Sequence, residues 1–341
     1  MVRYIGENNY KHGSEDRTGI LITNLGTPDL PNKKALKIYL QEFLSDPRVI
    51  EIPKYFWRII LYGIILQIRP KKSAKSYKNI WTNEGSPLLK IAKKQVQLVK
   101  EKLKNSYPNT VFILAMRYGN PSIENALKIL QEQNVRRILV FPLYPQYCAA
   151  TTASTFDLVT SILQKWRWIP ELRFINQYFE EESYIRALAK SIEDFWKKKG
   201  KPQKIIFSYH GIPKKYHIKG DPYYCFCLKT TRLVKEYMKL KDDDVITTFQ
   251  SRFGREEWLK PYTSEILKNL PLQGIKKIHI ISPGFSSDCL ETIEELEVEN
   301  REYFEKAGGN DYLYIPCLND NPAHIEMMVN LIQKHTQGWK V

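Results

Sequence analysis

The sequence predicts an α/β protein made of two doubly wound domains, each with a four-stranded parallel sheet flanked by helices. First, short runs rich in Val, Ile and Phe recur along the 341-residue chain without polar alternation, as in strands buried on both faces. Second, longer segments with helical patterns separate these runs, and such alternation is typical of parallel sheets. Third, a rhythm of four strands occurs twice, in a chain long enough for about two domains.

The predicted strands and helices follow one another in order. In the first half the strands cover 19–25, 110–116, 136–143 and 172–178. In the second half they cover 204–209, 245–250, 276–282 and 312–317. The predicted helices cover 87–105, 121–133, 151–166, 181–198, 223–240, 257–269, 288–306 and 321–336.

These elements set the expected domain boundaries. We expect an N-terminal domain over residues 1–178, a C-terminal domain over 179–320, and a last helical segment, 321–341, that packs back on the first domain. The Lys-rich run 197–204 lies near the expected hinge. It has the features of a helix end, because Lys is favoured there and Gly200 and Pro202 follow.

Composition excludes several classes of protein. Hydrophobic residues make up 43% of the chain and charged residues 26%, which excludes a disordered chain and a coiled coil. Five cysteines without regular spacing exclude a secreted disulfide scaffold and favour a reducing compartment. The net charge of +15 attracts anions, which include nucleic acid, anionic lipid and acidic small molecules.

Neither the N-terminus nor the longest apolar run predicts a membrane span or a targeting signal. The first 19 residues contain acids and no apolar run, so we expect a loose arm. The longest apolar run, 55–68, contains Arg58 and is shorter than the roughly 20 residues that a bilayer span needs.

The ends of the predicted strands are where a ligand is expected, because open α/β sheets bind ligands outside the carboxyl ends of their strands. The segments that follow the strands are aromatic, basic and rich in small residues. Two such rims predict a cleft between the domains that suits a large, flat, anionic ligand. The chain has no GxGxxG and no GxxxxGK[ST] motif, so it lacks the phosphate cradle of a dinucleotide or P-loop protein.

His210 is the first candidate for chemistry. It closes the predicted strand 204–209 and is followed by Gly211, which places it at the expected rim. An imidazole at this place can accept a proton or offer a lone pair to a metal ion, although a lone His is often only structural.

Acidic residues after the predicted strand 276–282 are the second candidate. Asp288 has the position of a helix cap. Glu291, Glu295 and Glu299 recur every fourth residue, so they share one helix face. Two interpretations remain open: a solvated acidic stripe, or a carboxylate track from the cleft that carries protons or divalent cations.

Several long motifs, met in a fixed order, resemble the ferrochelatase family. They extend from about Gly19 to about Pro322, nearly the whole chain. They are NLGTP (24–28), GSPL (85–88), MRYGNP (116–121), FPLYPQYCAATTAS (141–154), SYHGIPKKY (208–216), GDPYYCFCLKTTRL (220–233), QSRFGREEWLKPYT (250–263) and SPGFSSDCLETIEEL (282–296). The resemblance implies two Rossmann-like domains with a porphyrin cleft between them, and insertion of Fe2+ into a porphyrin to give haem.

The resemblance also implies roles for individual residues. The catalytic histidine of the family falls on His210 and its essential glutamate on Glu291, with further acids at Asp288 and Glu295. His210 and Glu291 are therefore also candidate transient ligands of Fe2+. Residues that the resemblance assigns to the porphyrin are Leu25, Arg69, Tyr77, Ser86, Arg117, Tyr118 and Trp258.

The sequence departs from the pattern of some family members at two places that contain or lack cysteine. Some members have a histidine two residues before the essential glutamate, where this chain has Cys289. Some members hold an iron–sulfur cluster on a cysteine-rich C-terminal tail, but no cysteine follows Cys317, so no such cluster and no tightly bound cofactor is expected.

The apolar segment 55–68 gains a second interpretation from the resemblance. Arg69 and four lysines follow it closely, and apolar surface beside clustered cations is typical of an interfacial membrane contact. An ordinary buried helix is the alternative. A membrane-facing lip favours protoporphyrin IX over the more soluble coproporphyrin, and a cytoplasmic protein attached peripherally to an anionic membrane surface.

Other functions remain open as alternatives to ferrochelatase activity. They are a chelatase for coproporphyrin III, another tetrapyrrole or another metal, and a porphyrin or haem carrier without turnover. Nucleic-acid binding is a third alternative that rests only on the charge of +15. No aromatic residues interleave with the Lys-rich run 197–204, so nucleic acid is not the expected partner. Protein partners and the oligomeric state do not follow from the sequence.

Overall fold

The structure, a computed structural model, describes residues 4–7, 10–254 and 256–341. The chain forms two compact units. One unit contains Met1–Leu143, Ala149–Asn176 and Ile325–Val341, and the other contains Tyr144–Cys148 and Gln177–His324. The chain therefore passes between units around Tyr144–Cys148 as well as near residues 177 and 325.

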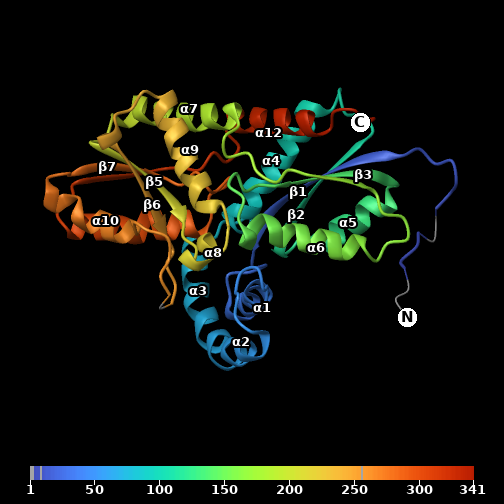
Figure 1. Ribbon diagram of the computed structural model, residues 1–341, viewed down its shortest axis with the longest axis horizontal. Helices are drawn as coiled ribbons and strands as arrows, with labels where there is room; N and C mark the ends of the chain where they lie inside the picture. Colours follow the sequence, from blue (N-terminus) through green and yellow to red (C-terminus); the bar gives the residue numbers. More distant parts are fainter. Residues whose placement is uncertain (1–3, 8–9, 255) are drawn as a thin grey trace. The chain divides into compact units, whose positions relative to one another are not determined.

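Each unit is built on a four-stranded parallel sheet (Figure 1). The first sheet has the order β2-β1-β3-β4 and the second has the order β6-β5-β7-β8. The strands of the first are β1 Arg17–Thr27, β2 Thr110–Gly119, β3 Val135–Pro142 and β4 Glu171–Phe174. The strands of the second are β5 Lys204–His210, β6 Val245–Gln250, β7 Lys277–Ile281 and β8 Asp311–Ile315. The predicted fold class, with all eight strands, is confirmed.

Helices cover both faces of each sheet. In Figure 1, α4 and α12 lie on one side of the first sheet and α5 and α6 on the other, while α7 and α9 lie opposite α10 across the second sheet. The helices of the first unit are α1 Lys33–Leu44, α2 Lys54–Ile60, α3 Leu66–Ile80, α4 Pro87–Leu103, α5 Ile123–Glu132, α6 Ser154–Leu163 and α12 Pro322–His335, which starts in the second unit. Those of the second unit are α7 Glu182–Lys199, α8 Lys214–Ile218, α9 Tyr223–Tyr237, α10 Thr263–Asn269 and α11 Asn300–Lys306.

Apolar side chains of strands and helices form the core of each unit. In the first unit Leu21 and Val140 pack with α5 through Leu127 and with Trp166 after α6. In the second unit Ile206 and Ile280 belong to a buried apolar cluster that includes Phe304 of α11. The absence of polar alternation in the strands reflects this burial on both faces.

One predicted helix starts later than expected. The pattern predicted a helix over 257–269, but α10 begins at Thr263. Pro261 explains the difference, because proline has no backbone N–H and disfavours helical geometry in the residue before it. Trp258 instead forms an antiparallel bridge with Pro213.

Part of the N-terminal arm is held against the first unit, contrary to the expected loose arm. The backbone N–H of Ile5 donates to the Lys165 carbonyl at 2.7 Å. Glu7 forms a bidentate ion pair with the buried guanidinium of Arg136, with N–O distances of 2.6 and 2.8 Å. Glu7 and Arg136 are 129 positions apart, so the sequence alone does not show that they form a pair.

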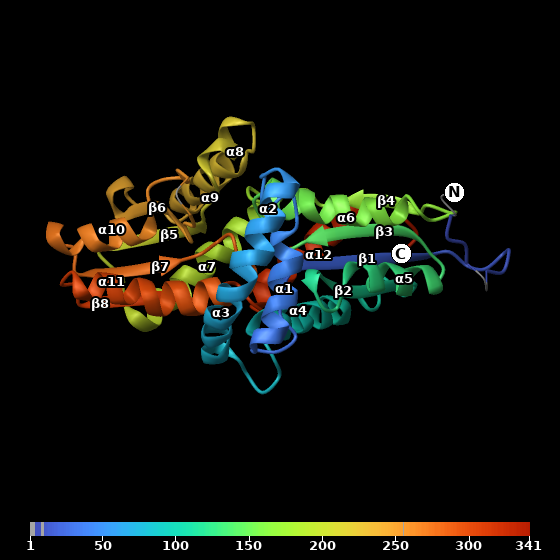
Figure 2. The same cartoon turned by 90° about the horizontal axis from the view of Figure 1, so that it is seen from below.

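The segment between β1 and α4 forms a helical group outside the predicted set. Asn32 caps α1, because its Oδ1 accepts from the Ala35 backbone N–H at 2.9 Å. Helices α1 and α3 pack side by side (Figure 2), and a short π-helix, η1 Leu61–Ile65, joins α2 to α3. No helix among the residues described is both long and apolar enough to span a membrane.

The described part of the chain has two further π-helices: η2 Ala149–Ala153 precedes α6, and η5 Glu291–Glu299 lies between β7 and α11. π-helices are rare and frequently occur at functional sites. The sequence predicted one continuous helix over 288–306. The wider winding changes how its acidic side chains are spaced.

Candidate active site

His210 ends β5 at the carboxyl edge of the second sheet, half-buried. Its Nδ1 lies 2.7 Å from the carbonyl oxygen of Gly211. Because a carbonyl oxygen only accepts, Nδ1 carries the hydrogen, and the neutral ring keeps its lone pair on Nε2. The ring is therefore oriented with one nitrogen free to act as a base or as a metal ligand.

Aromatic side chains surround this imidazole. The ring centroids of Trp258 and Phe285 lie 6.4 and 6.5 Å from that of His210. Gly211 allows this approach, since a Cβ there would lie 2.8 Å from the Gln250 carbonyl oxygen and 3.1 Å from the Trp258 ring. The structure thus brings the predicted residues His210 and Trp258 together.

Glu295 projects from the π-helix towards the end of β6. Its carboxylate accepts from the Ser251 backbone N–H at 2.7 Å and also from the Ser251 hydroxyl. Burial raises the pKa of Glu295, and the Ser251 hydrogen bonds and the charge of His210 oppose that rise. Glu291 carries a like charge close enough to raise the same pKa. The Gln250 side chain, opposite His210 in the sheet, donates to the Glu291 carbonyl and to Glu295, so one buried residue links the end of the sheet to both acids.

The acidic residues of the π-helix differ in exposure. Glu291 and Glu295 are half-buried, whereas Glu299 is exposed. The exposure of the three predicted acids therefore increases towards the end of the π-helix.

Asp288 has a separate set of partners in the same unit. Its Oδ1 accepts from the hydroxyls of Tyr314 at 2.6 Å and Thr292 at 3.0 Å. Its Oδ2 accepts from the Asn319 amide at 2.6 Å. The carboxylate anchors the chain just before the π-helix, which agrees with a capping role more directly than with proton transfer.

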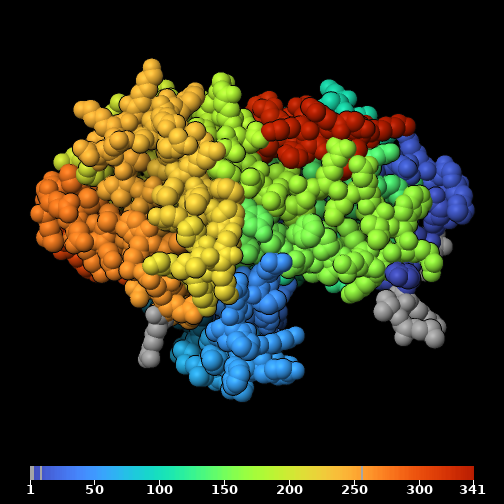
Figure 3. Space-filling view, viewed as in Figure 1, coloured from blue at the N-terminus to red at the C-terminus, as the bar shows by residue number. Residues whose placement is uncertain are grey.

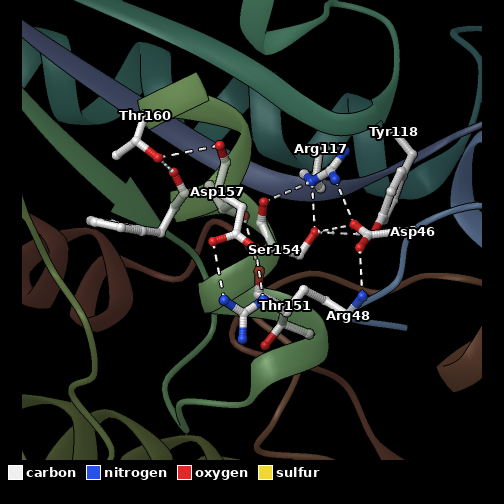
Figure 4. A network of polar contacts seen from close by, with 10 residues as sticks. Asp46, Arg48, Arg117, Tyr118, Thr151, Ser154, Asp157 and Thr160 are labelled. Atoms are coloured by element: carbon white, nitrogen blue, oxygen red, sulfur yellow. Dashed lines mark hydrogen bonds and ion pairs between the residues drawn. The ribbon is translucent and has the colours of Figure 1, made fainter. Parts of the chain in front are cut away.

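In the first unit, Arg117 and Tyr118 join a buried polar network centred on Asp46 (Figure 4). Asp46 Oδ2 accepts from Arg117 Nη2 at 2.5 Å, from the Tyr118 hydroxyl at 2.8 Å and from Ser154 Oγ at 2.5 Å. Tyr118 is 0% exposed, and burial is the main cause that raises its pKa. A substrate-facing Tyr118 side chain, as expected from the sequence, disagrees with this placement.

The remaining residues assigned to the porphyrin are also in the first unit. Ser86 is buried and caps α4, because its Oγ accepts from the Leu89 backbone N–H at 3.3 Å. Tyr77 is buried on α3 beside Trp81, with ring centroids 6.1 Å apart. Leu25 and Arg69 are half-buried, at β1 and on α3.

The residues of these networks that escaped the sequence-based prediction include Asp46, Gln250 and Ser251. Ser251 has a φ of 64°, in the left-handed region that non-glycine residues rarely occupy. Gln250 and Ser251 directly follow a predicted strand and belong to the QSRFG motif, which was the available signal. Asp46 follows a helix that was not predicted. Within the described part of the chain, no three His, Cys, Asp or Glu side chains are grouped so as to hold a metal ion.

Solved structures with a similar fold are chelatases. The chain aligns with SirB from Bacillus subtilis with Fe3+ at a TM-score of 0.57 and 14% identity, over 94% of this chain and 96% of that one. It aligns with CbiX, the terminal enzyme for biosynthesis of sirohaem in denitrifying bacteria, at a TM-score of 0.51 and 13% identity, over 93% and 98% of the two chains. At such identities the likeness concerns the fold alone.

Sequence relatives are much closer. The chain is 53% identical to the ferrochelatase of Marinobacter nauticus, over 99% of this chain and 92% of that protein. It is 54% identical to the ferrochelatase of Hydrogenovibrio crunogenus, over 97% and 89%. The ferrochelatase family model matches residues 17–336. With the two sheets and the His210 surroundings described above, these matches establish that the chain belongs to the ferrochelatase family.

Proposed function

We propose that this protein is a ferrochelatase that inserts Fe2+ into protoporphyrin IX and releases protohaem. Membership of the family, with identity near 50% over the whole chain, supports the reaction class, a lyase of the metal-chelatase type. The observation that supports the site is that His210 ends β5 opposite Gln250, whose side chain hydrogen-bonds to the Glu291 carbonyl and to Glu295.

The chemistry requires two operations on the porphyrin. Two pyrrole N–H protons must leave, and the nitrogen lone pairs must become available to the metal ion. In the proposal, His210 accepts a proton through Nε2, since Nδ1 donates to Gly211. Glu291 and Glu295 then carry the proton towards Glu299 and the surface.

His210 and Glu291 are also the proposed transient ligands of the incoming Fe2+, because imidazole and carboxylate both suit that ion. Asp288 belongs to the proposed group of acids in a supporting role, since its carboxylate is already engaged by Tyr314, Thr292 and Asn319.

For the porphyrin, we propose candidate contact residues on each unit separately. Trp258, beside His210, is the candidate on the second unit. Leu25, Arg69, Tyr77 and Ser86 are the candidates on the first. We assign Arg117 and Tyr118 a supporting role in the first unit, because both side chains already donate hydrogen bonds to Asp46.

We further propose peripheral attachment to the cytoplasmic face of an anionic membrane through the segment 55–68, here called the lip. Tyr55, Phe56 and Ile59 are 84%, 70% and 73% exposed, which is unusual for large apolar side chains. Figure 3 shows the blue atoms of this part of the chain standing out on the surface of its unit. Exposed lysines follow on α3: Lys71, Lys72, Lys75 and Lys78. A buried lip helix, the alternative interpretation, disagrees with this exposure.

Turnover under anaerobic conditions tests the proposed reaction. Purified protein is mixed with a large excess of Fe2+ and protoporphyrin IX, and haem is followed by its absorbance. Many equivalents of haem per protein support an enzyme, whereas one equivalent indicates a carrier. Parallel reactions with coproporphyrin III and with Co2+ test the alternative substrates, and a preference for either would overturn the proposed one.

A further inference from the structure

The Gln250 side chain links β5, the strand that ends at His210, to the π-helix η5, which begins at Glu291. It is the last residue of β6, is 3% exposed, and stands opposite His210 in the register of β5 with β6. Its side-chain Oε1 accepts from Ser208 Oγ at 2.8 Å. Its Nε2 donates to the carbonyl oxygen of Glu291 at 2.9 Å and to Glu295 Oε2 at 3.3 Å.

These hydrogen bonds use both ends of the amide. The oxygen is bound on the strand side and the nitrogen on the helix side, so neither a flipped amide nor a shorter side chain can replace the arrangement. The backbone carbonyl of Gln250 also accepts from the Gly211 N–H at 2.8 Å. One buried residue thus contacts the neighbour of His210 and the first residue of the π-helix.

The contact between Gln250 and the Glu291 carbonyl matters because η5 has π-helical rather than α-helical winding. The N–H of Asn300 donates to the Glu295 carbonyl, the i to i−5 pattern of a π-helix. A side-chain donor that enters the carbonyl ladder of a helix is a recognised cause of altered helix geometry. Gln250 supplies such a donor at the residue where the π-helix begins.

We propose that Gln250 is a positioning residue, whose side-chain amide fixes the first turn of the π-helix so that Glu291 and Glu295 stay in register with His210. The inference rests on the proposed function for its catalytic consequence. The alternative is a purely structural glutamine that contributes only to the stability of the unit.

A matched pair of variants separates these two roles. Gln250→Met keeps the side-chain size and removes the amide. The control is Gln146→Met, in the same unit, where Gln146 is equally buried and donates to Thr230 Oγ1 on α9 at 3.0 Å. Gln250→Glu is the second variant, because it keeps the acceptor for Ser208 and loses the donors to the π-helix.

Three quantities are measured for each variant: Tm, steady-state kinetics with Fe2+ and protoporphyrin IX, and hydrogen exchange of the backbone amides in 291–300. We expect Gln250→Met and Gln250→Glu to lower kcat by about 10- to 100-fold, the cost typical of a misplaced catalytic group. Exchange in 291–300 should accelerate in both. The control should lose a comparable Tm, with kcat within about twofold of the wild type and unchanged exchange in 291–300.

A kcat for both Gln250 variants within twofold of the control would overturn the positioning role, as would unchanged exchange in 291–300. Absence of turnover in the wild-type protein would instead reject the proposed function. The exchange comparison would then still decide whether Gln250 fixes the π-helix.

Discussion

The Asp46 carboxylate and the Arg117 guanidinium form an ion pair with a 2.5 Å N–O distance, and their side chains are 4% and 13% exposed. Asp46 precedes the turn into the lip, whereas Arg117 is on β2, so the pair joins the base of the lip to the sheet. The Arg48 backbone N–H also donates to Asp46, at 2.8 Å. The positive charge of Arg117 is therefore balanced inside the protein.

Asp46→Ala should lower the free energy of unfolding by about 3–5 kcal/mol, because it leaves the buried Arg117 charge without its partner. Asp157→Ala is the control, since Asp157 pairs with Arg48 at 2.7 Å on an exposed surface. That pair should contribute about 1 kcal/mol or less. Urea unfolding of both variants measures the difference. Equal decreases in the free energy of unfolding would contradict the view that Asp46 stabilises the buried Arg117 charge.

His210→Ala should abolish metal insertion while the protein stays folded. The ring is half-buried at a strand end and hydrogen-bonds to the adjacent Gly211, a local contact whose loss should leave the sheet intact. Haem formation and the circular dichroism spectrum are measured on the purified variant. Turnover near the wild-type rate would remove His210 from the proposed site.

Glu291→Gln should reduce kcat far more than Glu299→Gln. Glu291 is half-buried near Glu295 and His210, whereas Glu299 lies at the exposed end of the same π-helix. Loss of a general acid or base typically costs about 10²- to 10⁴-fold in rate. We expect that range for Glu291→Gln and a change of about twofold or less for Glu299→Gln. Similar rates in the two variants would indicate that the acidic residues are only a solvated surface.

The sequence predicted the strands well and the contacts between them poorly, for physical reasons. Runs such as residues 204–209 are apolar throughout because both faces of the strand are buried, and this signal is local. The Glu7–Arg136 pair depends on a fold that joins distant segments, and no local pattern encodes it. The change from α- to π-winding at Glu291 depends on tertiary contacts, among them the Gln250 donor.

The same limit applies to the candidate site. His210 could be recognised because it ends a strand, and strand ends in parallel sheets bind ligands. Tyr118 has the same kind of position, yet its hydroxyl donates to Asp46, which follows a helix that the apolar pattern did not reveal. Proximity to a strand end predicts where a residue lies, and side-chain partners decide whether it is available.

The stability of the second unit should decrease on acidification between about pH 6.5 and pH 4 because of His279. Burial lowers the pKa of His279 to about 4, opposed by Asp311 and helped by Lys277. Both ring nitrogens are buried without a hydrogen-bond partner among the residues described. In the window between the two pKa values the unfolded chain binds the proton more readily, so unfolding becomes easier as the pH falls.

The size of this effect is about 1.4 kcal/mol per pH unit within the window. His279→Leu should flatten the pH dependence of the unfolding free energy, and the exposed His12→Leu should leave it unchanged. Part of the slope should remain in His279→Leu, because burial also lowers the pKa of His324 to about 4. Urea unfolding at pH 7, 6, 5 and 4.5 measures the slopes, and identical slopes in His279→Leu and the wild type would refute this account.

The lip should bind anionic vesicles weakly and reversibly. Apolar side chains such as Phe56, Ile59 and Ile64 are exposed, and their transfer from water contributes about 25 cal/mol per Å² of buried apolar surface. Each lysine near an anionic surface adds about 1 kcal/mol. Fourteen residues, 55–68, are too few to cross the hydrocarbon core, so the attachment that we propose is peripheral.

Two pairs of substitutions should weaken vesicle binding by different routes. Ile59→Ser with Ile64→Ser removes apolar contact and should weaken binding at every salt concentration. Lys71→Gln with Lys72→Gln should weaken it mainly at low salt, because the Debye length falls to about 10 Å at 0.1 M. Co-sedimentation with phosphatidylglycerol vesicles across a salt series measures both effects, with phosphatidylcholine vesicles as the uncharged control. Wild-type protein that stays in the supernatant at low salt would contradict membrane attachment through the lip.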